Sequence, residues 1–364
     1  MGLRCRGLIN QVYGIVITNS TWMVGIKTPM SGHHDSLFYE SSSASTSITS
    51  SVLAYKYENG RRYHAFREGN YPLPNDEREQ DRLDLFHHIT KLNLDGELFL
   101  APLGPSPQRA LDFGTGTGIW ALEFADLHPG CDVIGTDLSP IQPSWVPPNC
   151  HFLVDDVEAE WQFDAPFDFV HGRTMSGSIG DWPRLYGQIY KNLKPGGWVE
   201  MQEFEIKFQS DDGAFERAPT FAQWEKDLMK ASQVFGKELE TAQRQAGWMK
   251  DAGFVNVVDD KRPVSSYDPY LSGRTVAYMP VALKSPVGPW PKNRKLKEIG
   301  RYNVPHCMDA VESFTLALFT RVLGYTVEEC QVLISKLKAE LRDPKVHMYW
   351  YYHFIYGQKP EDTK

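Results

Sequence analysis

The sequence predicts a doubly wound α/β fold, in which helices cover both faces of a mostly parallel sheet. From Arg109 onward, short apolar runs alternate with stretches of helical period. The first run leads into a glycine-rich turn, GTGTG at 114–118, and acidic residues end the next two runs. Such an alternation implies right-handed crossovers between parallel strands. We therefore expect a ligand crevice at the carboxyl ends of the strands.

The elements follow one another along residues 110–208. Buried strands are predicted at ALDFG, CDVIGTD, CHFLVDD, FDFVHG and GGWVEMQEFEIKF, and helices at IWALEFADLH and WPRLYGQIYKNL. Farther on, ELETAQRQAGWMKDAGFVNVV predicts a helix that runs into a strand, and HMYWYYHFIYGQKP predicts a closing strand. Between them, TVEECQVLISKLKAEL predicts a helix with a capping box of Thr326 and Glu329 and a stop at Pro344.

Five segments are expected in the domain organisation. Residues 1–53 form a serine-rich arm with too few apolar residues to order, and 54–108 form a helical cap whose helix takes Asn75 as N-cap. The core is expected at 109–262, an irregular insertion at 263–282, and a helical lid with the closing strand at 283–360. The insertion and residues 1–29, which precede Met30, either belong to the mature protein or reflect a translated intron and a misplaced start.

Composition excludes several classes of function. The 364 residues carry a net charge of -8, which argues against general binding to nucleic acid or to an anionic membrane. The five cysteines are scattered and lack zinc-ligand spacing, so we expect no metal site and a reducing, intracellular location in cytoplasm, nucleus or both. Polar residues interrupt the apolar stretch near the start, which disfavours an export signal.

The glycine-rich turn carries the first functional signal. Gly114, Gly116 and Gly118 leave the backbone open to a ligand at a helix start. The spacing is Gly-x-Gly-x-Gly rather than the Gly-x-Gly-x-x-Gly of dinucleotide sites, and Asp112 precedes it. Asp112 is placed either to order the turn or to meet an amino group of the ligand. Such turns also serve tight packing alone.

Acidic residues at the next strand ends narrow the class of ligand. Asp137 lies about 20 residues on, where a carboxylate accepts hydrogen bonds from ribose hydroxyls. Asp155 and Asp156 end the following strand, where a carboxylate can accept from the exocyclic amine of adenine. Taken singly, Asp137 could be a helix cap and Asp156 a solvated acid. Together they favour a cationic ligand that carries adenosine, S-adenosylmethionine, over the anionic NAD and ATP.

The same stretches resemble a known family. ALDFGTGTGIWALEFA, VIGTDLSPIQPSWVPPN, FLVDDVEAEW, FDFVHGR and LKPGGWVEMQE resemble, in order, the motifs of class I S-adenosylmethionine-dependent methyltransferases. The flanks YENGRRYHAFREGNYPLPNDEREQDRLDLFHH and GPWPKNRKLKEIGRYN are similar to the LaeA-like methyltransferases of fungi. The similarity spans about residues 55–360. It implies a Rossmann-like sheet with an antiparallel C-terminal strand and helical lid additions.

The resemblance also implies roles for single residues. It places the methionine moiety on the glycine turn behind Asp112, the ribose at Asp137 and the adenine near Asp155 and Asp156. Tyr63, Tyr71 and Arg82 become candidates for the rim of the cofactor site, although both tyrosines are equally compatible with simple packing.

The acceptor side is less determined by the sequence. His171 is the best-placed general base because its ordinary pKa lies near neutrality, although a histidine at a strand end is often structural. Arg173, Met175 and Trp182 are expected to line the acceptor pocket. Two functions stay open: methylation of a small natural-product molecule, or regulation of secondary metabolism in a complex with velvet-type protein partners.

Overall fold

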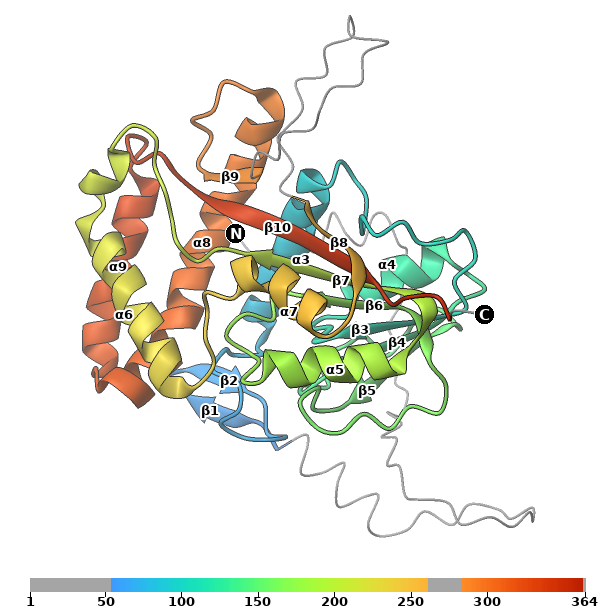
Figure 1. Ribbon diagram of the computed structural model, residues 1–364. Coiled ribbons are helices and arrows are strands. Elements are labelled where there is room, and N and C mark those ends of the chain that lie inside the picture. Colours follow the sequence, from blue (N-terminus) through green and yellow to red (C-terminus); the bar gives the residue numbers. More distant parts are fainter. Residues whose placement is uncertain (1–53, 261–282, 363–364) are drawn as a thin grey trace, which may run out of the picture.

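The computed structural model describes residues 54–260 and 283–362 (Figure 1). The expectations for the serine-rich arm and for the insertion at 263–282 lie outside the described residues. Within the described ranges, no helix is both long enough and apolar enough to cross a membrane.

A single eight-stranded sheet forms the centre of the molecule. Its parallel part has the order β5-β4-β3-β6-β7, made of β3 (Arg109–Phe113), β4 (Asp132–Asp137), β5 (Cys150–Val154), β6 (Phe167–Arg173) and β7 (Leu193–Phe204). β10 (Met348–Gln358) lies antiparallel to β7, and β8 (Val255–Asp260) and β9 (Leu283–Val287) pair antiparallel with β10. The expected parallel sheet with an antiparallel closing strand is confirmed. From β3, the next strands along the chain, β4 and β5, lie on one side, and β6 and β7 lie on the other. This reversal of the strand order places a crevice at the carboxyl ends of β3 and β6.

Helices cover both faces of this sheet (Figure 1). On one face, α4 (Ile119–Leu127) packs Trp120 and Phe124 against Ala110 and other small and aromatic strand residues. On the other face, α5 (Trp182–Asn192) and α7 (Gln245–Asp251) pack against Leu111 and its neighbours. Because Ala110 and Leu111 are consecutive and point to opposite faces, β3 is buried on both sides, as its continuous apolar run predicts.

A third cluster of side chains joins a group of helices to the β10 side of the sheet. This group contains α3 (Glu77–Asn93), α6 (Pro219–Phe235), α8 (Arg294–Leu318) and α9 (Val327–Arg342). Three short helical segments flank these helices: η1 (Ala214–Arg217) precedes α6, η2 (Ala242–Arg244) lies between α6 and α7, and the π-helical η3 (Phe319–Leu323) joins α8 to α9. A small hairpin of β1 (Lys56–Glu58) and β2 (Arg61–Tyr63) precedes α3.

The helix caps agree with the sequence at one end of the chain and differ at the other. The capping box of Thr326 and Glu329 begins α9 as predicted. The N-cap of α3 is Asp76 and not Asn75, because the Asp76 carboxylate accepts from the backbone N–H of Glu79 at 3.0 Å. Asn75 instead donates to the hydroxyl of Ser139, 3.1 Å away, and so ties α3 to the loop after β4.

Candidate functional site

The glycine turn begins directly after β3 and ends at the first residue of α4. Gly114, Gly116 and Gly118 have φ of +62°, +59° and +82°, a region that L residues enter at a cost of about 1–2 kcal/mol. A Cβ on Gly118 would lie 2.4 Å from the ring of Phe152, and one on Gly114 would lie 2.3 Å from the sulfur of Met175. A Cβ on Gly116 would meet only Leu83, at 3.5 Å. Gly116 is therefore the glycine of this turn at which an added Cβ would make no clash within the protein.

Asp112 holds this turn from beneath. Its Oδ2 accepts from the hydroxyl of Thr115 at 2.5 Å, and its Oδ1 lies 2.7 Å from Nδ1 of His171. The carboxylate is 3% exposed. Both oxygens are thus engaged inside the protein, which favours the expectation that Asp112 orders the turn over the expectation that it meets the ligand.

His171 lies inside the sheet rather than at its edge. Its ring stacks on that of Trp120, with centroids 3.8 Å apart and planes 5° apart, and none of its surface is exposed. Burial lowers the pKa of His171, although the adjacent Asp112 opposes that shift. A ring enclosed in this way has no open face toward an acceptor, so its placement lends no support to a role as general base. His171 positions Asp112 instead.

Asp137 connects the glycine turn with the loop that follows β4. Its Oδ2 accepts from the backbone N–H of Gly116 at 2.9 Å, and its Oδ1 accepts from the N–H of Ser139 at 2.8 Å. Burial raises the pKa of Asp137 to about 6, against the effect of these two hydrogen bonds. A carboxylate has about four acceptor positions, so two remain for the hydroxyls of a ribose.

The acids after β5 lie toward the outside of the same strand ends. Asp156 forms an ion pair with Arg67 at 3.5 Å and accepts from the N–H of Glu158 at 3.0 Å. Asp155 accepts from the N–H of Asp156 at 2.8 Å, and its own N–H donates to the carbonyl of Asp137. Arg67 belongs to the segment between the hairpin and α3, so that segment is tied to the end of β5.

The three expected rim residues separate into two places. Tyr71 interacts electrostatically with Asp137 and Arg82, and burial raises its pKa. Arg82 donates to both carboxylate oxygens of Glu79 at 3.1 Å. Tyr63 is 2% exposed and packs under the guanidinium of Arg321, 5.0 Å from its ring centroid. Tyr63 therefore matches the packing alternative. Tyr71 and Arg82 lie near each other, and Tyr71 lies near Asp137.

A cavity of about 610 Å³, solvent at its mouth included, opens beside the turn. Its walls come from α3, the loops after β6 and β7, the end of α6, and α8. The lining residues are Tyr71, Pro72, Leu73, Arg82, Leu83, Phe86, Thr174, Ser176, Gly177, Ser178, Phe204, Ile206, Ser232, Phe235, Lys237, Leu239, Phe314 and Leu318. Leu83 borders both this cavity and Gly116, so the two sites adjoin.

The three residues expected to line the acceptor pocket, Arg173, Met175 and Trp182, do not line this cavity. Met175 is packed against Gly114, and Trp182 is buried between helices, with its ring stacked 5.5 Å from that of Trp248. Arg173 lies at the end of β6, among α3, α4 and Asp112. The loop contributes its next residues instead, Thr174 and Ser176 to Ser178. Thr174 has φ +55°, and this turn of the backbone redirects the chain toward the cavity.

Some contributors were absent from the sequence-based set. Gln142 donates to the carbonyls of Gly116 and Ser139, at 2.7 and 3.0 Å, and Asp84 accepts from Thr117 at 2.7 Å. Glu203 accepts from the N–H groups of Met175 and Ser176 and holds the loop after β6. A charged residue inside the apolar β7 pattern was an available signal for Glu203. Gln142 lies in a proline-rich loop, and no periodic pattern marks it.

Two features define this protein as a class I methyltransferase that uses S-adenosylmethionine. They are the strand order, with β10 inserted antiparallel between β7 and β8, and the glycine turn at the central strand.

The family described as a methyltransferase domain matches residues 85–258. Methyltransferase pytC of Aspergillus terreus is 44% identical over 322 residues, covering 88% of this chain and 93% of pytC. The secondary metabolism regulator laeA of Aspergillus fumigatus is 33% identical over 89% of this chain and 83% of its own length. The protein-methionine methyltransferase laeA of Emericella nidulans is 34% identical, with 83% and 76% covered. The chain belongs to the LaeA-like family of S-adenosylmethionine-dependent methyltransferases.

Proposed function

We propose that this protein transfers the methyl group of S-adenosylmethionine to a small, largely apolar acceptor bound in the cavity beside the glycine turn. The observation that carries this proposal is the shared wall of the two sites. Leu83 faces Gly116 on one side and the cavity on the other, while Tyr71 lines the cavity and interacts with Asp137. An acceptor in the cavity would thus lie next to a cofactor on the turn.

The residues at the strand ends fit the cofactor. Gly116 offers an open backbone, Asp137 has acceptor capacity for the ribose, and Asp156 with Asp155 lies one strand farther along. The cofactor supplies a methyl group already activated by its sulfonium. What the chain must add is alignment of the two reactants and exclusion of water. Apolar walls such as Leu73, Phe86 and Phe314 suit the second task.

The side chains that line the cavity indicate the chemical class of the acceptor. More than half of its lining residues are aliphatic or aromatic. The polar side chains are those of Tyr71, Arg82, Thr174, Ser176, Ser178, Ser232 and Lys237. Small-molecule sites commonly combine an apolar wall with a few polar groups that fix orientation. We therefore place a secondary metabolite with a polar group on an apolar skeleton ahead of a protein side chain.

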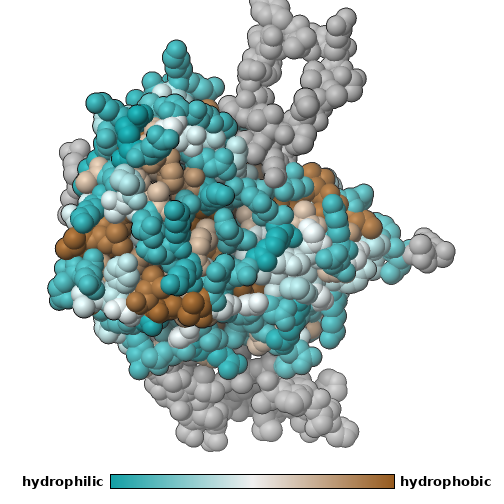
Figure 2. Space-filling view, turned by 60° about the vertical axis from the view of Figure 1, so that its left-hand side comes forward, coloured by the Kyte–Doolittle hydropathy of each residue, from teal (hydrophilic) through white to brown (hydrophobic). Residues whose placement is uncertain are grey.

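A second candidate function rests on the relatives. One laeA relative is named a regulator of secondary metabolism and another a protein-methionine methyltransferase, and this chain could act similarly in a complex with a velvet-type partner. The face in Figure 2 is mostly hydrophilic, and its apolar areas are small and separate. Obligate interfaces are typically large and apolar, so that face does not favour a permanent partner.

Transfer of a labelled methyl group distinguishes the two candidates. We expect label from S-adenosylmethionine to enter the small-molecule fraction of a metabolite extract, and Ser178→Phe, which fills the cavity, to reduce this at least about tenfold. The affinity of the Ser178→Phe variant for S-adenosylhomocysteine should stay unchanged. A second control, Val332→Phe on the exposed face of α9, should keep the turnover of the unaltered protein. Label that enters only protein would overturn the small-molecule proposal in favour of the second candidate.

A further inference from the structure

Four cationic side chains border the cofactor and acceptor sites, and three of them already have an anionic partner. Arg67 pairs with Asp156 at 3.5 Å, Arg82 pairs with Glu79 at 2.5 Å, and Lys237 pairs with Glu158. The side chain of the fourth, Arg173, makes no hydrogen bond or ion pair with any residue in the described ranges. Its interactions there are electrostatic ones at longer range, with Tyr352, Asp112, Glu123 and Asp84.

Those neighbouring acids are themselves occupied. Asp112 is held by Thr115 and His171, Asp84 accepts from Thr117, and Glu123 pairs with Lys91 at 2.5 Å. Their combined negative charge stabilises a cation at Arg173 without satisfying its five N–H donors. Arg173 is partly buried, so its guanidinium is held in place while its donors have no acceptor in the protein. A guanidinium of this kind is suited to bind an anionic ligand.

The place of Arg173 decides which anion that is. Arg173 follows Gly172, which pairs in register with Phe113, the residue immediately before the glycine turn. Two of the acids in its range, Asp84 and Asp112, contact threonines of that turn. Arg173 is also absent from the walls of the acceptor cavity. Its guanidinium therefore belongs to the methionine end of the cofactor site and not to the acceptor.

We propose that Arg173 binds the carboxylate of the methionine tail of the cofactor. The tail is a zwitterion, and the site offers a cation for its carboxylate among acids that suit its ammonium and sulfonium. A planar guanidinium matches a carboxylate with two parallel hydrogen bonds, which fixes the tail and hence the direction of the methyl group. The inference rests on the cofactor alone and is independent of the identity of the acceptor.

Calorimetric binding of two ligands tests this contact without any turnover. S-adenosylhomocysteine and its decarboxylated counterpart, S-adenosyl-3-thiopropylamine, differ in the carboxylate alone. We expect the unaltered protein to bind the first roughly ten- to a hundredfold more tightly, the scale of hydrogen bonds to charged groups. This arm needs no variant, so equal affinities for the two ligands would overturn the proposal outright.

Variants then assign the preference to Arg173. In Arg173→Gln the two ligands should bind about equally, because only the carboxylate-bearing one loses affinity, and Arg173→Lys should keep part of the preference. Arg67→Gln should leave the preference intact, because its partner Asp156 follows β5, which is separated from β6 by β4 and β3. Should Arg173→Gln weaken both ligands by the same factor, Arg173 would merely balance its neighbouring acids. An unchanged preference in that variant would equally exclude the contact.

Discussion

Gly116 differs from the other two glycines of its turn in what surrounds its Cα. Gly114 and Gly118 lie against Met175 and Phe152, so packing alone accounts for both. Gly116 combines a left-handed backbone with surroundings in which an added Cβ meets only Leu83, at 3.5 Å. That combination explains why the turn is more than a tight connection between β3 and α4, because a ligand can approach its backbone there.

We predict that Gly116→Val lowers the affinity for S-adenosylhomocysteine more than about tenfold while the protein still folds. A β-branched residue at φ +59° costs about 1–2 kcal/mol, and its side chain occupies the space that the ligand needs. Calorimetry of the folded variant measures this loss. Gly324→Val is the matched control, because Gly324 also has a positive φ, +74°, and a Cβ there meets nothing within 4 Å. Unchanged affinity in Gly116→Val would remove Gly116 from the site.

Glu203 is a buried carboxyl with a consequence for stability. Burial raises its pKa to about 7, although three donors from Met175 and Ser176 oppose the shift. A carboxyl that binds its proton more tightly when folded contributes stability that is fully present below its unfolded pKa. That contribution is lost as the pH rises through about 7.

We therefore predict that Glu203→Gln destabilises the protein most at acidic pH. At pH 5 the Glu203 carboxyl is protonated, and its hydroxyl oxygen can still accept a hydrogen bond, whereas the amide nitrogen that replaces it only donates. This loss costs roughly 1–3 kcal/mol of unfolding free energy at pH 5. The amide does not ionise, so the difference from the unaltered protein should shrink by pH 8. Urea unfolding at both pH values measures it, and a difference that does not change with pH would contradict the shifted pKa.

At the scale of single residues, the sequence predicted the place of a residue along its strand better than it predicted which side chains pack around that residue. Asp137 was placed at the end of its strand from a spacing that depends only on local chain geometry. The enclosure of His171 was not predictable, because Trp120 reaches it from a helix on another part of the chain. That Arg173 and Met175 do not line the cavity was not predictable for a similar reason. The backbone turns at Thr174, and sequence patterns do not record a positive φ.

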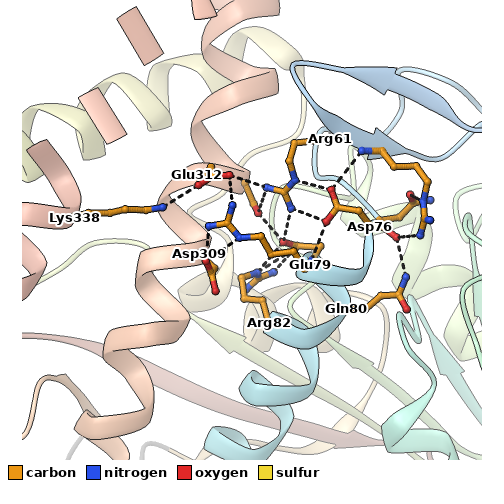
Figure 3. Close-up of polar contacts among 12 residues, drawn as sticks. Arg61, Asp76, Glu79, Gln80, Arg82, Asp309, Glu312 and Lys338 are labelled. Carbon is orange, nitrogen blue, oxygen red and sulfur yellow. Dashed lines mark hydrogen bonds and ion pairs between the residues drawn. The ribbon is translucent and has the colours of Figure 1, made fainter. Parts of the chain in front are cut away.

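Among the elements, α3 positions one wall of both sites, and Figure 3 shows how it is held. Arg61 from the hairpin pairs with Asp76 at 2.6 Å and lies 3.6 Å from Glu312 of α8. Glu79 binds Arg82 and accepts from the hydroxyl of Ser313 at 2.6 Å. This charged network fastens the hairpin, α3 and α8 together and fixes the face that carries Arg82 and Leu83.

We predict that Glu79→Ala lowers the free energy of unfolding by about 3–5 kcal/mol, since it leaves Arg82 buried without its anionic partner. Glu77→Ala, on the same helix turn, removes a pair with Arg62 at a carboxylate that is 62% exposed, and should cost at most about 1 kcal/mol. Chemical denaturation compares the two. Equal costs would show that the network has no special role in holding α3.

Periodic elements were predictable and interrupted ones were not. The strands β3 to β7 and the helix α9 carry clear apolar periods and caps, and the structure has them where the sequence predicts. By contrast, α8 contains Pro305 within its 25 residues, and a proline in that position ordinarily ends a helix. The observed N-cap of α3 is one residue later than the predicted one. Asn75 and Asp76 are both good N-cap residues, and their tertiary contacts, with Ser139 and Arg61 respectively, decide between them.

For the molecule as a whole, the sheet and the helical group have separate tasks. In the proposed function, the sheet ends hold the cofactor through backbone and carboxylate groups, and the acceptor binds in the cavity lined by α3, α6 and α8. The sequence predicted the first part because its motifs lie in one continuous stretch. It could not predict the second, because the cavity is assembled from segments up to about 250 residues apart, Tyr71 and Leu318 among them.

The most direct test of a cofactor site at the glycine turn is discrimination at the ribose by Asp137. Loss of affinity in Asp137→Ala is ambiguous by itself, because the carboxylate also holds Gly116 and Ser139. The informative comparison is between S-adenosylhomocysteine and its 2′-deoxy analogue, measured by calorimetry on both proteins. We predict that the unaltered protein prefers the ribose form by roughly ten- to a hundredfold and that Asp137→Ala hardly distinguishes the two. An equal preference in both proteins would contradict the assignment of the ribose to Asp137 and, with it, the position of the cofactor on this turn.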